Sequence, residues 1–237
     1  MKLILVRMAY PKPSFLPFFL MVAMNAFAQP ISFKASKQYV AEVFDIVYKK
    51  PKGFVDLNIS EPWGPGEGRQ RIGLIYSPVL QSKDNDCIIM YPVVSLLAVK
   101  LSPRNLLTSE ITAALGLVDK DGLLLKDTKV DFDKYAEIRA GEYVHRCFNA
   151  DTVFIAQLPV KKTYREKYNY CTSICLYKKD RPTLVLKLFF TEAGKQHEEE
   201  YIGLLCKRIW YKGENWEYDK EKAIKADHDI LYKDKYK

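Results

Sequence analysis

Short runs of β-forming residues, separated by polar connections, constrain the fold of this chain more than any other sequence feature. Each run is five to ten residues long and rich in Val, Ile, Phe, Tyr and Thr, which is typical of strands. Residues 178–182 have the length and polarity of a hairpin connection, so we expect the last two strands to pair antiparallel. The predicted strands cover residues 54–58, 71–76, 87–94, 152–158, 168–177 and 183–190.

Helical patterns are inserted singly between these strands. Residues 108–115 predict a short helix, for which Thr108 or Ser109 can serve as the N-cap. A longer helix is predicted after Thr191, with acidic residues in its first half and basic residues near its end. Residues 39–48 fit either a helix or a strand. Single helices without regular βαβ alternation predict an α+β fold, a single domain whose mainly antiparallel sheet packs against helices.

The first 28 residues have the pattern of a secretory signal peptide. The segment begins with three basic residues, Lys2, Arg7 and Lys12, and an apolar run follows at 15–23. Ala26 and Ala28 then occupy the two positions that a signal peptidase recognises. The run is shorter than the roughly 20 residues needed to cross a bilayer. We therefore expect cleavage after Ala28, a periplasmic or secreted protein, and no transmembrane segment after cleavage.

The rest of the chain is predicted to form a domain at 29–211 and a charged C-terminal tail at 212–237. The tail holds seven Lys and seven Asp or Glu but few apolar residues. Such a segment buries too little apolar surface to offset the entropy of ordering, about 1 to 2 kcal/mol per residue. We therefore expect the tail to be loosely docked.

The positive charge is concentrated in two clusters, at 161–167 and 178–181. After residue 28 the chain carries a net charge of +5, which is modest for a nucleic-acid binder and predicts no nucleic-acid partner. The clusters flank the predicted strand at 168–177, so they would lie about 30 Å apart and form separate sites. The first alternates cations with aromatic rings, as surfaces for proteins or anionic glycans often do. Its candidate binding residues are Lys161, Lys162, Tyr164 and Arg165.

Trp63 opens a segment rich in Gly and Pro, residues 63–69, and is the fifth candidate binding residue. Glycine-rich loops bind phosphate when their N–H groups lie at a helix N-terminus. Here the Lys-Ser/Thr ending of a phosphate loop is absent and a strand is predicted next. We interpret the segment as a surface connection, with a ligand-covering loop as the alternative.

The five cysteines predict neither a dense disulfide framework nor a metal site. Cys171 and Cys175 would be about 13 Å apart on one strand, too far for a mutual disulfide or for a shared zinc ion. We expect most of the cysteines to be buried free thiols and expect no metal or cofactor. Cross-strand pairs such as Cys147 with Cys171 remain open.

The chain contains no recognisable catalytic motif. The common serine nucleophile patterns are absent, and His145 with Cys147 reads as a structural pair on one face of a strand. We therefore expect an exported, non-catalytic protein that binds a partner or assists an extracytoplasmic assembly. The alternative is a secreted hydrolase whose site combines His145 with acids distant in the sequence.

Tyr48, Gly53-Phe54-Val55 and Pro62-Trp63 resemble the opening of the PsbP/Mog1-like domain, where a Gly-Phe strand leads to a Pro and a Trp. The later order of two strands, a Thr-rooted helix and its Tyr and Trp is also similar, so the resemblance covers residues 37–211. It implies an antiparallel sheet flanked by helices and a non-enzymatic role in binding a larger protein assembly. No functional residue is carried over.

Overall fold

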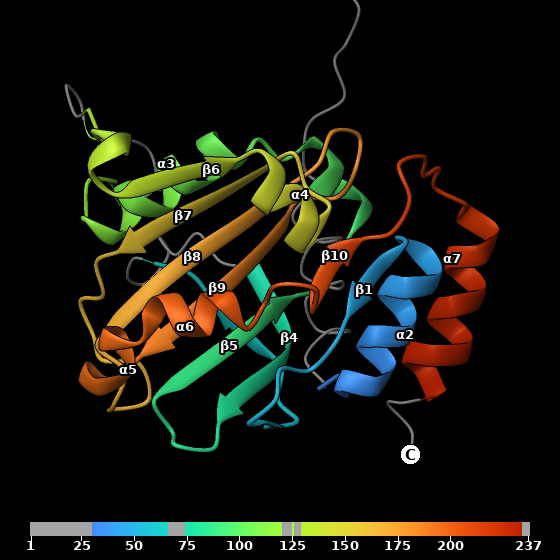
Figure 1. The fold of residues 1–237 in the computed structure, drawn as a ribbon, viewed down its shortest axis with the longest axis horizontal. Helices are drawn as coiled ribbons and strands as arrows, with labels where there is room; N and C mark the ends of the chain where they lie inside the picture. Colours follow the sequence, from blue (N-terminus) through green and yellow to red (C-terminus); the bar gives the residue numbers. More distant parts are fainter. Residues whose placement is uncertain (1–29, 66–73, 120–124, 126–128, 234–237) are drawn as a thin grey trace, which may run out of the picture.

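An eight-stranded antiparallel sheet with helices on both faces forms the body of the molecule (Figure 1). The computed structural model describes residues 30–65, 74–119, 125 and 129–233. The predicted α+β class is confirmed. The predicted signal peptide at 1–28 and residues 66–69 of the Gly-rich segment lie outside the described residues.

The strands of the large sheet run in the order β2-β4-β5-β9-β8-β7-β6, and β3 also pairs with β4. The pairing of β8 with β9 is antiparallel, as the hairpin prediction requires. A second, two-stranded sheet joins β1 (Ile46–Tyr48) to β10 (Ile209–Tyr211). The strands of the large sheet are β2 (Phe54–Asp56), β3 (Glu61–Trp63), β4 (Leu74–Ser82), β5 (Cys87–Pro92), β6 (Ala136–Ala140), β7 (Thr152–Leu158), β8 (Tyr170–Tyr177) and β9 (Leu184–Phe190).

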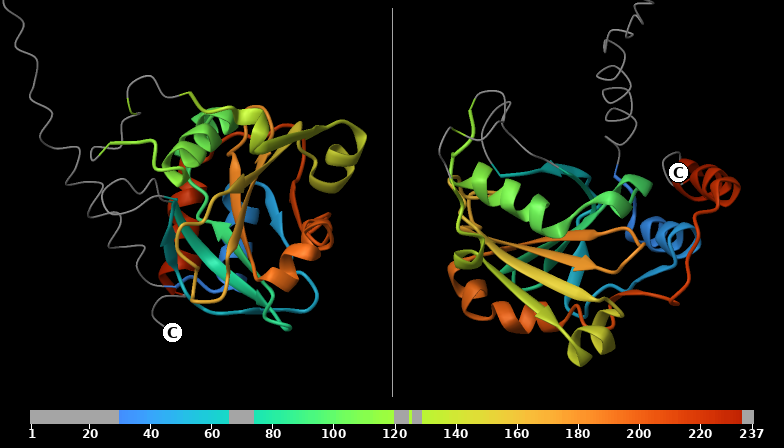
Figure 2. Two further views of the ribbon diagram at one scale, coloured as in Figure 1. Left: turned by 90° about the vertical axis from the view of Figure 1, so that its left-hand side faces the viewer. Right: turned by 90° about the horizontal axis from the view of Figure 1, so that it is seen from above.

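Helices lie on both sides of the large sheet. Figure 2 shows α3 on one side and α4, α5 and α6 on the other. The α-helices are α2 (Phe33–Val43), α3 (Pro103–Ala114), α4 (Glu142–Phe148), α5 (Glu192–Gln196), α6 (Glu198–Gly203) and α7 (Lys220–Ala226). Short 3₁₀ segments are η2 (Leu96–Lys100) and η3 (Phe132–Lys134), and η4 (Asp227–Tyr232) is a π-helix.

Strand alternation divides the buried side chains between two cores. On β9, Leu186 and Leu188 belong to the core that contains α2, α4 and the small sheet, whereas Val185 and Phe189 belong to the core beneath α3. Every residue of β9 is buried, because the strand lies in the middle of the sheet and is covered on both faces. The runs of β-forming residues, rather than this alternation, made β7, β8 and β9 predictable to within two residues.

The helix boundaries differ from the sequence predictions at two places. α3 begins at Pro103 rather than near Thr108, because Ser102 supplies the cap: its hydroxyl accepts a hydrogen bond from the Asn105 N–H. The helix predicted after Thr191 is divided into α5 and α6 at His197, whose backbone leaves the helical region. Residues 39–48 contain the end of α2 followed by β1.

His145 and Cys147 lie in a helix, so their predicted placement on one face of a strand is wrong. Asn149 ends α4 in the left-handed conformation, with φ 47°. The residues that α4 buries are Val144, Cys147 and Phe148, which have helical spacing. With seven residues, α4 is too short for that spacing to be recognised in the sequence.

The prediction of a loosely docked tail is also wrong for the described residues. α7 and η4 lie along α2 (Figure 1) and add Ala223, Ala226 and Ile230 to the main core. These three residues are spaced by three and four, so the charged residues between them occupy the outward faces. The Trp216 indole N–H donates to the Val43 carbonyl oxygen at 3.1 Å. The core therefore extends past the boundary predicted at 211.

The second basic cluster, at 178–181, is largely internal rather than a separate surface site. Lys178 is 5% exposed and Arg181 is 1% exposed. Lys178 forms an ion pair with Glu214 at 2.8 Å, while the Arg181 guanidinium donates to backbone carbonyl oxygens.

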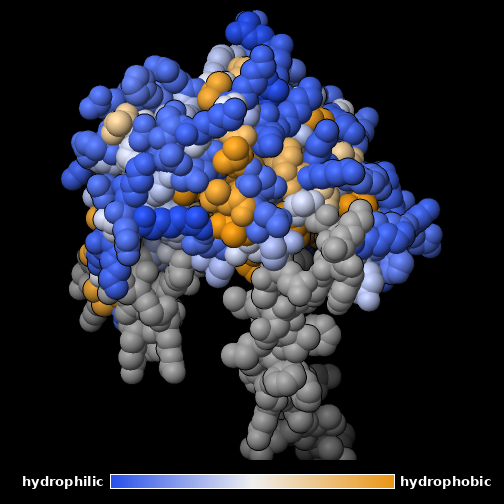
Figure 3. Space-filling view, turned by 90° about the horizontal axis from the view of Figure 1, so that it is seen from below, coloured by the Kyte–Doolittle hydropathy of each residue, from blue (hydrophilic) through white to orange (hydrophobic). Residues whose placement is uncertain are grey.

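Apolar side chains remain exposed elsewhere: seen from below, they gather near the middle of the surface within hydrophilic surroundings (Figure 3).

Because the C-terminal segment completes a core, removing the residues after Gly213 is expected to destabilise the protein strongly. Ile230→Ala alone should lower the free energy of unfolding by about 2 to 4 kcal/mol, since the side chain is 6% exposed. The matched control is Ile224→Ala, 59% exposed in the same stretch, with a cost below about 0.5 kcal/mol. Urea unfolding measures all three proteins, and equally small losses would restore the loosely docked tail.

Candidate functional site

The structure brings three of the predicted binding residues together. Trp63 and Tyr164 both contact Phe189, with ring centroids 4.9 and 4.3 Å away. The Tyr164 hydroxyl donates a short hydrogen bond to Glu61, and the Arg165 guanidinium lies 3.2 Å from the same carboxylate. Burial and then the Glu61 hydrogen bond raise the pKa of Tyr164, so the phenol keeps its proton as a donor.

The contacts of this cluster mainly connect the 161–167 loop to β3. They leave little of its positive charge available to a partner. Arg165 is held by both Glu61 and the Tyr164 oxygen, which leaves its guanidinium largely satisfied. Lys161 extends over the turn after α3, where a Cβ atom on Gly116 would lie 2.4 Å from its Nζ. Lys162 is exposed. Binding by these five residues stays a prediction, but their contacts are largely internal to the fold.

A second group of cations, which we call the basic surface, lines two adjoining hollows that share Lys49. The first hollow has a volume of about 500 Å³ and also contains His145 and Trp210. The second has a volume of about 400 Å³ and reaches the start of α2. The cations of the basic surface are Lys34, Lys37, Lys49, Lys50, Arg146, Lys207 and Lys212.

The small β1–β10 sheet positions the centre of the basic surface. Lys49 follows β1 and Lys207 precedes β10, and the two chain segments are joined where the Lys49 N–H donates to the Arg208 carbonyl oxygen at 2.6 Å. Lys212 leaves β10 on the other side, and its N–H donates to the Asp45 carbonyl oxygen at 2.8 Å. Backbone pairing therefore fixes the spacing of cations that are far apart in the sequence.

Positive charge dominates the walls of both hollows. Among the described lining residues, Asp56 is the one carboxylate, and it already accepts hydrogen bonds from the N–H groups of Phe33 and Asn58. The Lys49 ammonium lies 4.5 Å from the Trp210 ring centroid. Cations held close together by the backbone repel one another, and a bound anion would relieve that repulsion.

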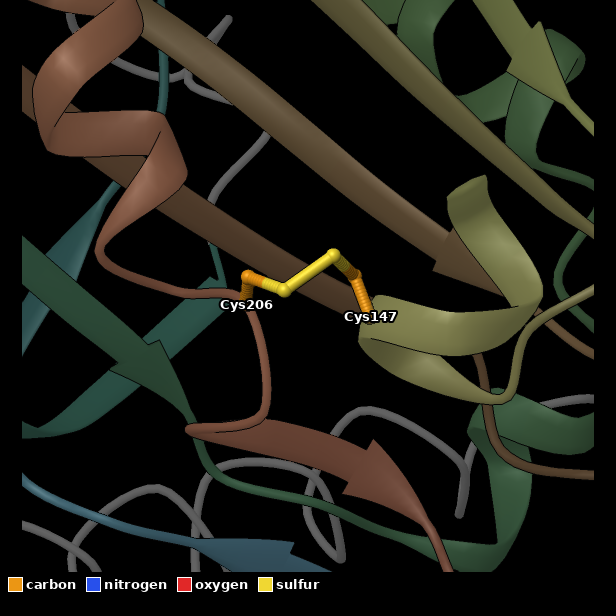
Figure 4. Close-up of a disulfide and its surroundings, with 2 residues drawn as sticks. All are labelled: Cys147 and Cys206. Atoms are coloured by element: carbon orange, nitrogen blue, oxygen red, sulfur yellow. A yellow bond between two sulfur atoms is a disulfide. The ribbon is translucent and has the colours of Figure 1, made fainter. Parts of the chain in front are cut away.

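A disulfide between Cys147 and Cys206 holds one wall of the first hollow (Figure 4). It joins α4 to the segment between α6 and β10, and the Lys207 N–H donates to the Cys147 carbonyl oxygen at 2.8 Å. Arg146 and Lys207 are thereby fixed on neighbouring segments. The remaining cysteines, Cys87, Cys171 and Cys175, are buried free thiols, so that expectation is confirmed for three of the five, whereas the pair with Cys171 is not formed.

The geometry around His145 does not assemble an acid-base pair. The side chain is exposed, and the described residues that line its hollow include no carboxylate. General acid-base catalysis requires a partner within hydrogen-bonding reach of the reacting group. The hydrolase alternative therefore gains no support from this position.

Ser173 and Lys187 form a second arrangement that could suggest catalysis. The Ser173 Oγ and Lys187 Nζ atoms are 2.5 Å apart, and the same ammonium lies 2.5 Å from Glu110 Oε2. However, Lys187 and Ser173 are fully buried and Glu110 is 2% exposed, beneath α3. A substrate cannot reach this trio, so we interpret it as a buried ion pair with its hydroxyl partner.

Comparison with known proteins adds no family assignment. No protein-family model matches this chain, and neither a curated protein nor a solved structure does. The resemblance to the PsbP/Mog1-like domain therefore stays a prediction.

In the described ranges no group of three or more His, Cys, Asp or Glu is arranged to hold a metal ion. Similarly, none of the described helices has the length and apolar character needed to cross a membrane.

The basic surface is hard to predict from sequence because its cations come from separate segments. Only Lys49 and Lys50 are adjacent in the sequence, and this pair does not stand out among 37 Lys and Arg. Their meeting depends on β1 pairing with β10, a contact across more than 150 residues. A local scan of charge cannot detect such a surface.

The disulfide is expected to contribute about 2 to 4 kcal/mol to the free energy of unfolding, because it closes a long loop in the unfolded chain. The Cys147→Ser/Cys206→Ser variant should unfold at correspondingly lower urea concentration than the oxidised wild type. Adding a reductant should destabilise the wild type and leave the variant unchanged. Equal sensitivity of both proteins to the reductant would contradict the assigned pairing.

The buried ion pair gives a second stability prediction. Lys187→Met should lower the free energy of unfolding by about 3 to 5 kcal/mol, because it leaves the Glu110 carboxylate buried without its cation. Glu110→Leu added to Lys187→Met should recover most of that loss, since no charge then remains to be desolvated. Chemical unfolding of the single and double variants measures the coupling. A double variant that is no better than the single one would show that the pair is not structural.

Proposed function

We propose that this chain is an exported, non-catalytic binding protein that holds an anionic glycan on its basic surface. The observation that carries the proposal is the meeting of seven cations in two hollows that share Lys49. One carboxylate among the described lining residues, together with Asp45 at 4.0 Å from the Lys212 ammonium, leaves this region with an excess of positive charge. A region with this balance attracts an acidic partner over several ångströms before contact.

The arrangement favours a partner with several negative groups over a single small anion. The seven cations are exposed and come from α2, α4 and the segments that flank the small sheet, so they do not converge on one point. Exposed ion pairs contribute little individually, and a polymer that contacts many of them gains the sum. An acidic polysaccharide has this spacing of charge along a chain.

Trp210 favours a glycan over an acidic protein. Its ring is partly buried in the wall of the first hollow, between cations on both sides in the sequence, Lys207 and Lys212. Aromatic rings present a flat apolar face while their edges stay near polar groups, a combination suited to a sugar ring with hydroxyl and acid substituents. Lys49 lies near the same ring and can pair with those acid groups.

Two further observations support export. The predicted signal peptide would release the chain after Ala28, and disulfides such as Cys147–Cys206 persist mainly in oxidising compartments outside the cytosol. The disulfide also holds the wall of the hollow that carries Arg146. Oxidation on export would thus complete the proposed binding surface.

Binding to heparin, a sulfated polysaccharide, tests the proposal with matched charge reversals. Lys49→Glu/Arg146→Glu should weaken binding at least about tenfold at low salt, since each reversal removes an attraction and adds a repulsion. The control Lys83→Glu/Lys179→Glu changes the net charge equally at exposed positions outside both hollows, and should have a much smaller effect.

A third variant, Lys161→Glu/Lys162→Glu, separates the basic surface from the site predicted by sequence. Calorimetric titration with heparin at two salt concentrations measures all four proteins. A wild type that does not bind, or equal losses in the target and control variants, would reject the proposal. A loss confined to the third variant would move the site to residues 161–165.

A further inference from the structure

A mainly apolar cavity of about 460 Å³ lies between the large sheet and the pair formed by α2 and η4. Its volume is within the 300 to 1,000 Å³ that is typical of small-molecule sites. It shares no lining residue with the two hollows of the basic surface. The apolar lining residues are Ile31, Val40, Leu74, Ile75, Pro92, Val93, Val94, Leu97, Ala98, Leu101, Val185 and Leu231.

The cavity forms where β4 and β5 stop pairing. Their ladder has an irregularity between Tyr76 and Val79, and its last pair joins Tyr76 to Pro92. A proline has no N–H to continue a ladder, so β5 ends there. The chain then leaves the sheet through η2, which places Ala98 and Leu97 across from the start of β4. The Val93 N–H still donates to the Ile75 carbonyl oxygen at 3.1 Å, so the cavity lies beside the end of this ladder and is bounded by η2.

Two hydroxyl groups in the wall, those of Ser77 and Thr183, already have hydrogen-bond partners within the protein. The Ser77 hydroxyl accepts from the Ile31 N–H at 3.0 Å and donates to the Ile31 carbonyl oxygen at 3.2 Å. The Thr183 hydroxyl donates to the Leu101 carbonyl oxygen at 3.1 Å. These groups therefore offer little hydrogen bonding to a ligand. The larger part of an occupant must be apolar, since polar atoms placed here would lose their water without replacement.

One wall carries a negative charge. Asp227 lines the cavity and is exposed, so its carboxylate lies where the cavity meets solvent. Burial first, and then the charge and hydrogen bond of Asp227, raise the pKa of Tyr39, which lines the same wall. The Tyr39 phenol therefore keeps its proton and adds no negative charge beside the Asp227 carboxylate. No Lys or Arg is among the described residues that line the cavity.

The π-helix η4 is the local device that builds this wall. π-helices are rare and are frequently found at functional sites. Here the π segment Asp227–Tyr232 brings Asp227 and Leu231 to the same cavity. Leu97, which is 77% exposed, provides an apolar edge from η2.

From these features we infer that the cavity binds a small amphiphile with an apolar chain or ring system inside and a positively charged end beside Asp227. The apolar walls accept the hydrophobic part, and the carboxylate selects against an anionic end group. This site is independent of the proposed glycan surface, because it has different lining residues and the opposite charge preference. Failure of one proposal leaves the other untouched.

Displacement of the neutral apolar fluorophore N-phenyl-1-naphthylamine tests the site in the disulfide-intact protein. Dodecylamine should displace the fluorophore at a concentration at least tenfold lower than dodecanoate, because both have the same chain and opposite charges. Asp227→Asn should remove most of that difference. Equal displacement by both amphiphiles in the wild type would overturn the assigned charge preference.

Filling the cavity provides the structural half of the test. Ala98→Leu adds volume to a wall residue that is 8% exposed and should weaken fluorophore binding at least tenfold. Ala193→Leu, an exposed alanine on α5, is the matched control and should bind like the wild type. If Ala98→Leu does not fold, Val94→Phe fills the same space from another position. Unchanged fluorophore binding in a folded cavity-filled variant, or none in the wild type, would reject the site.

Discussion

The guanidinium of Arg181 connects the parts of this structure that the large sheet alone does not hold. It donates to the carbonyl oxygens of Phe44 at 2.7 Å, Asp45 at 3.0 Å and Gly213 at 3.1 Å. Its central carbon also lies 5.2 Å from the Tyr211 ring centroid and 5.4 Å from that of Trp216. From the β8–β9 connection, one side chain thus reaches the end of α2, the small sheet and the C-terminal segment. Burial lowers the pKa of Arg181, and these contacts replace part of the water that it loses, since its Nε atom is buried without a hydrogen-bond partner among the described residues.

The basic surface depends on this anchoring. Asp45 and Tyr211, both in contact with Arg181, flank the pairing of β1 with β10, which spaces Lys49 and Lys212. The disulfide secures the opposite side of the same strand pair through Cys206. A buried cation and a covalent bond therefore hold together exposed cations that would otherwise repel one another. The stability of this region and its charge pattern have the same physical origin.

Local patterns in the sequence were sufficient for β2, β5, β7, β8 and β9 but not for the rest of the large sheet or for the small sheet. β7 was predicted over its whole length, because its run of β-forming residues marks a strand regardless of its partners. α4 was missed because seven residues give less than two turns of evidence, and β6 because its exposed edge carries polar residues. For the C-terminal segment, the high content of charged residues led to the wrong prediction of a loosely docked tail. A count of charges does not show that Ala223, Ala226 and Ile230 share one face.

The candidate sites were harder to predict than the fold because each one combines distant segments. The sequence-based candidates Trp63, Tyr164 and Arg165 do meet, but around Glu61, a partner that no local pattern associates with them. In the same way, Arg181 looked like a surface cation because its neighbours in the sequence are polar. Its burial follows from three carbonyl groups that two remote segments direct toward it. The sequence shows which side chains are present. Their surroundings can be predicted only once the topology is known.

The helix α2 separates the two proposed sites and shows how one short element can serve both. Lys34 and Lys37 line a hollow of the basic surface, while Ser36, Tyr39 and Val40 line the apolar cavity. Residues three or four apart share a face of a helix, and the two sets are offset by about half a turn. The side chains of one helix therefore divide between solvent-facing cations and an apolar wall. Because η4 contacts α2 from the other side, the C-terminal segment that composition marked as dispensable supplies the third wall of the cavity.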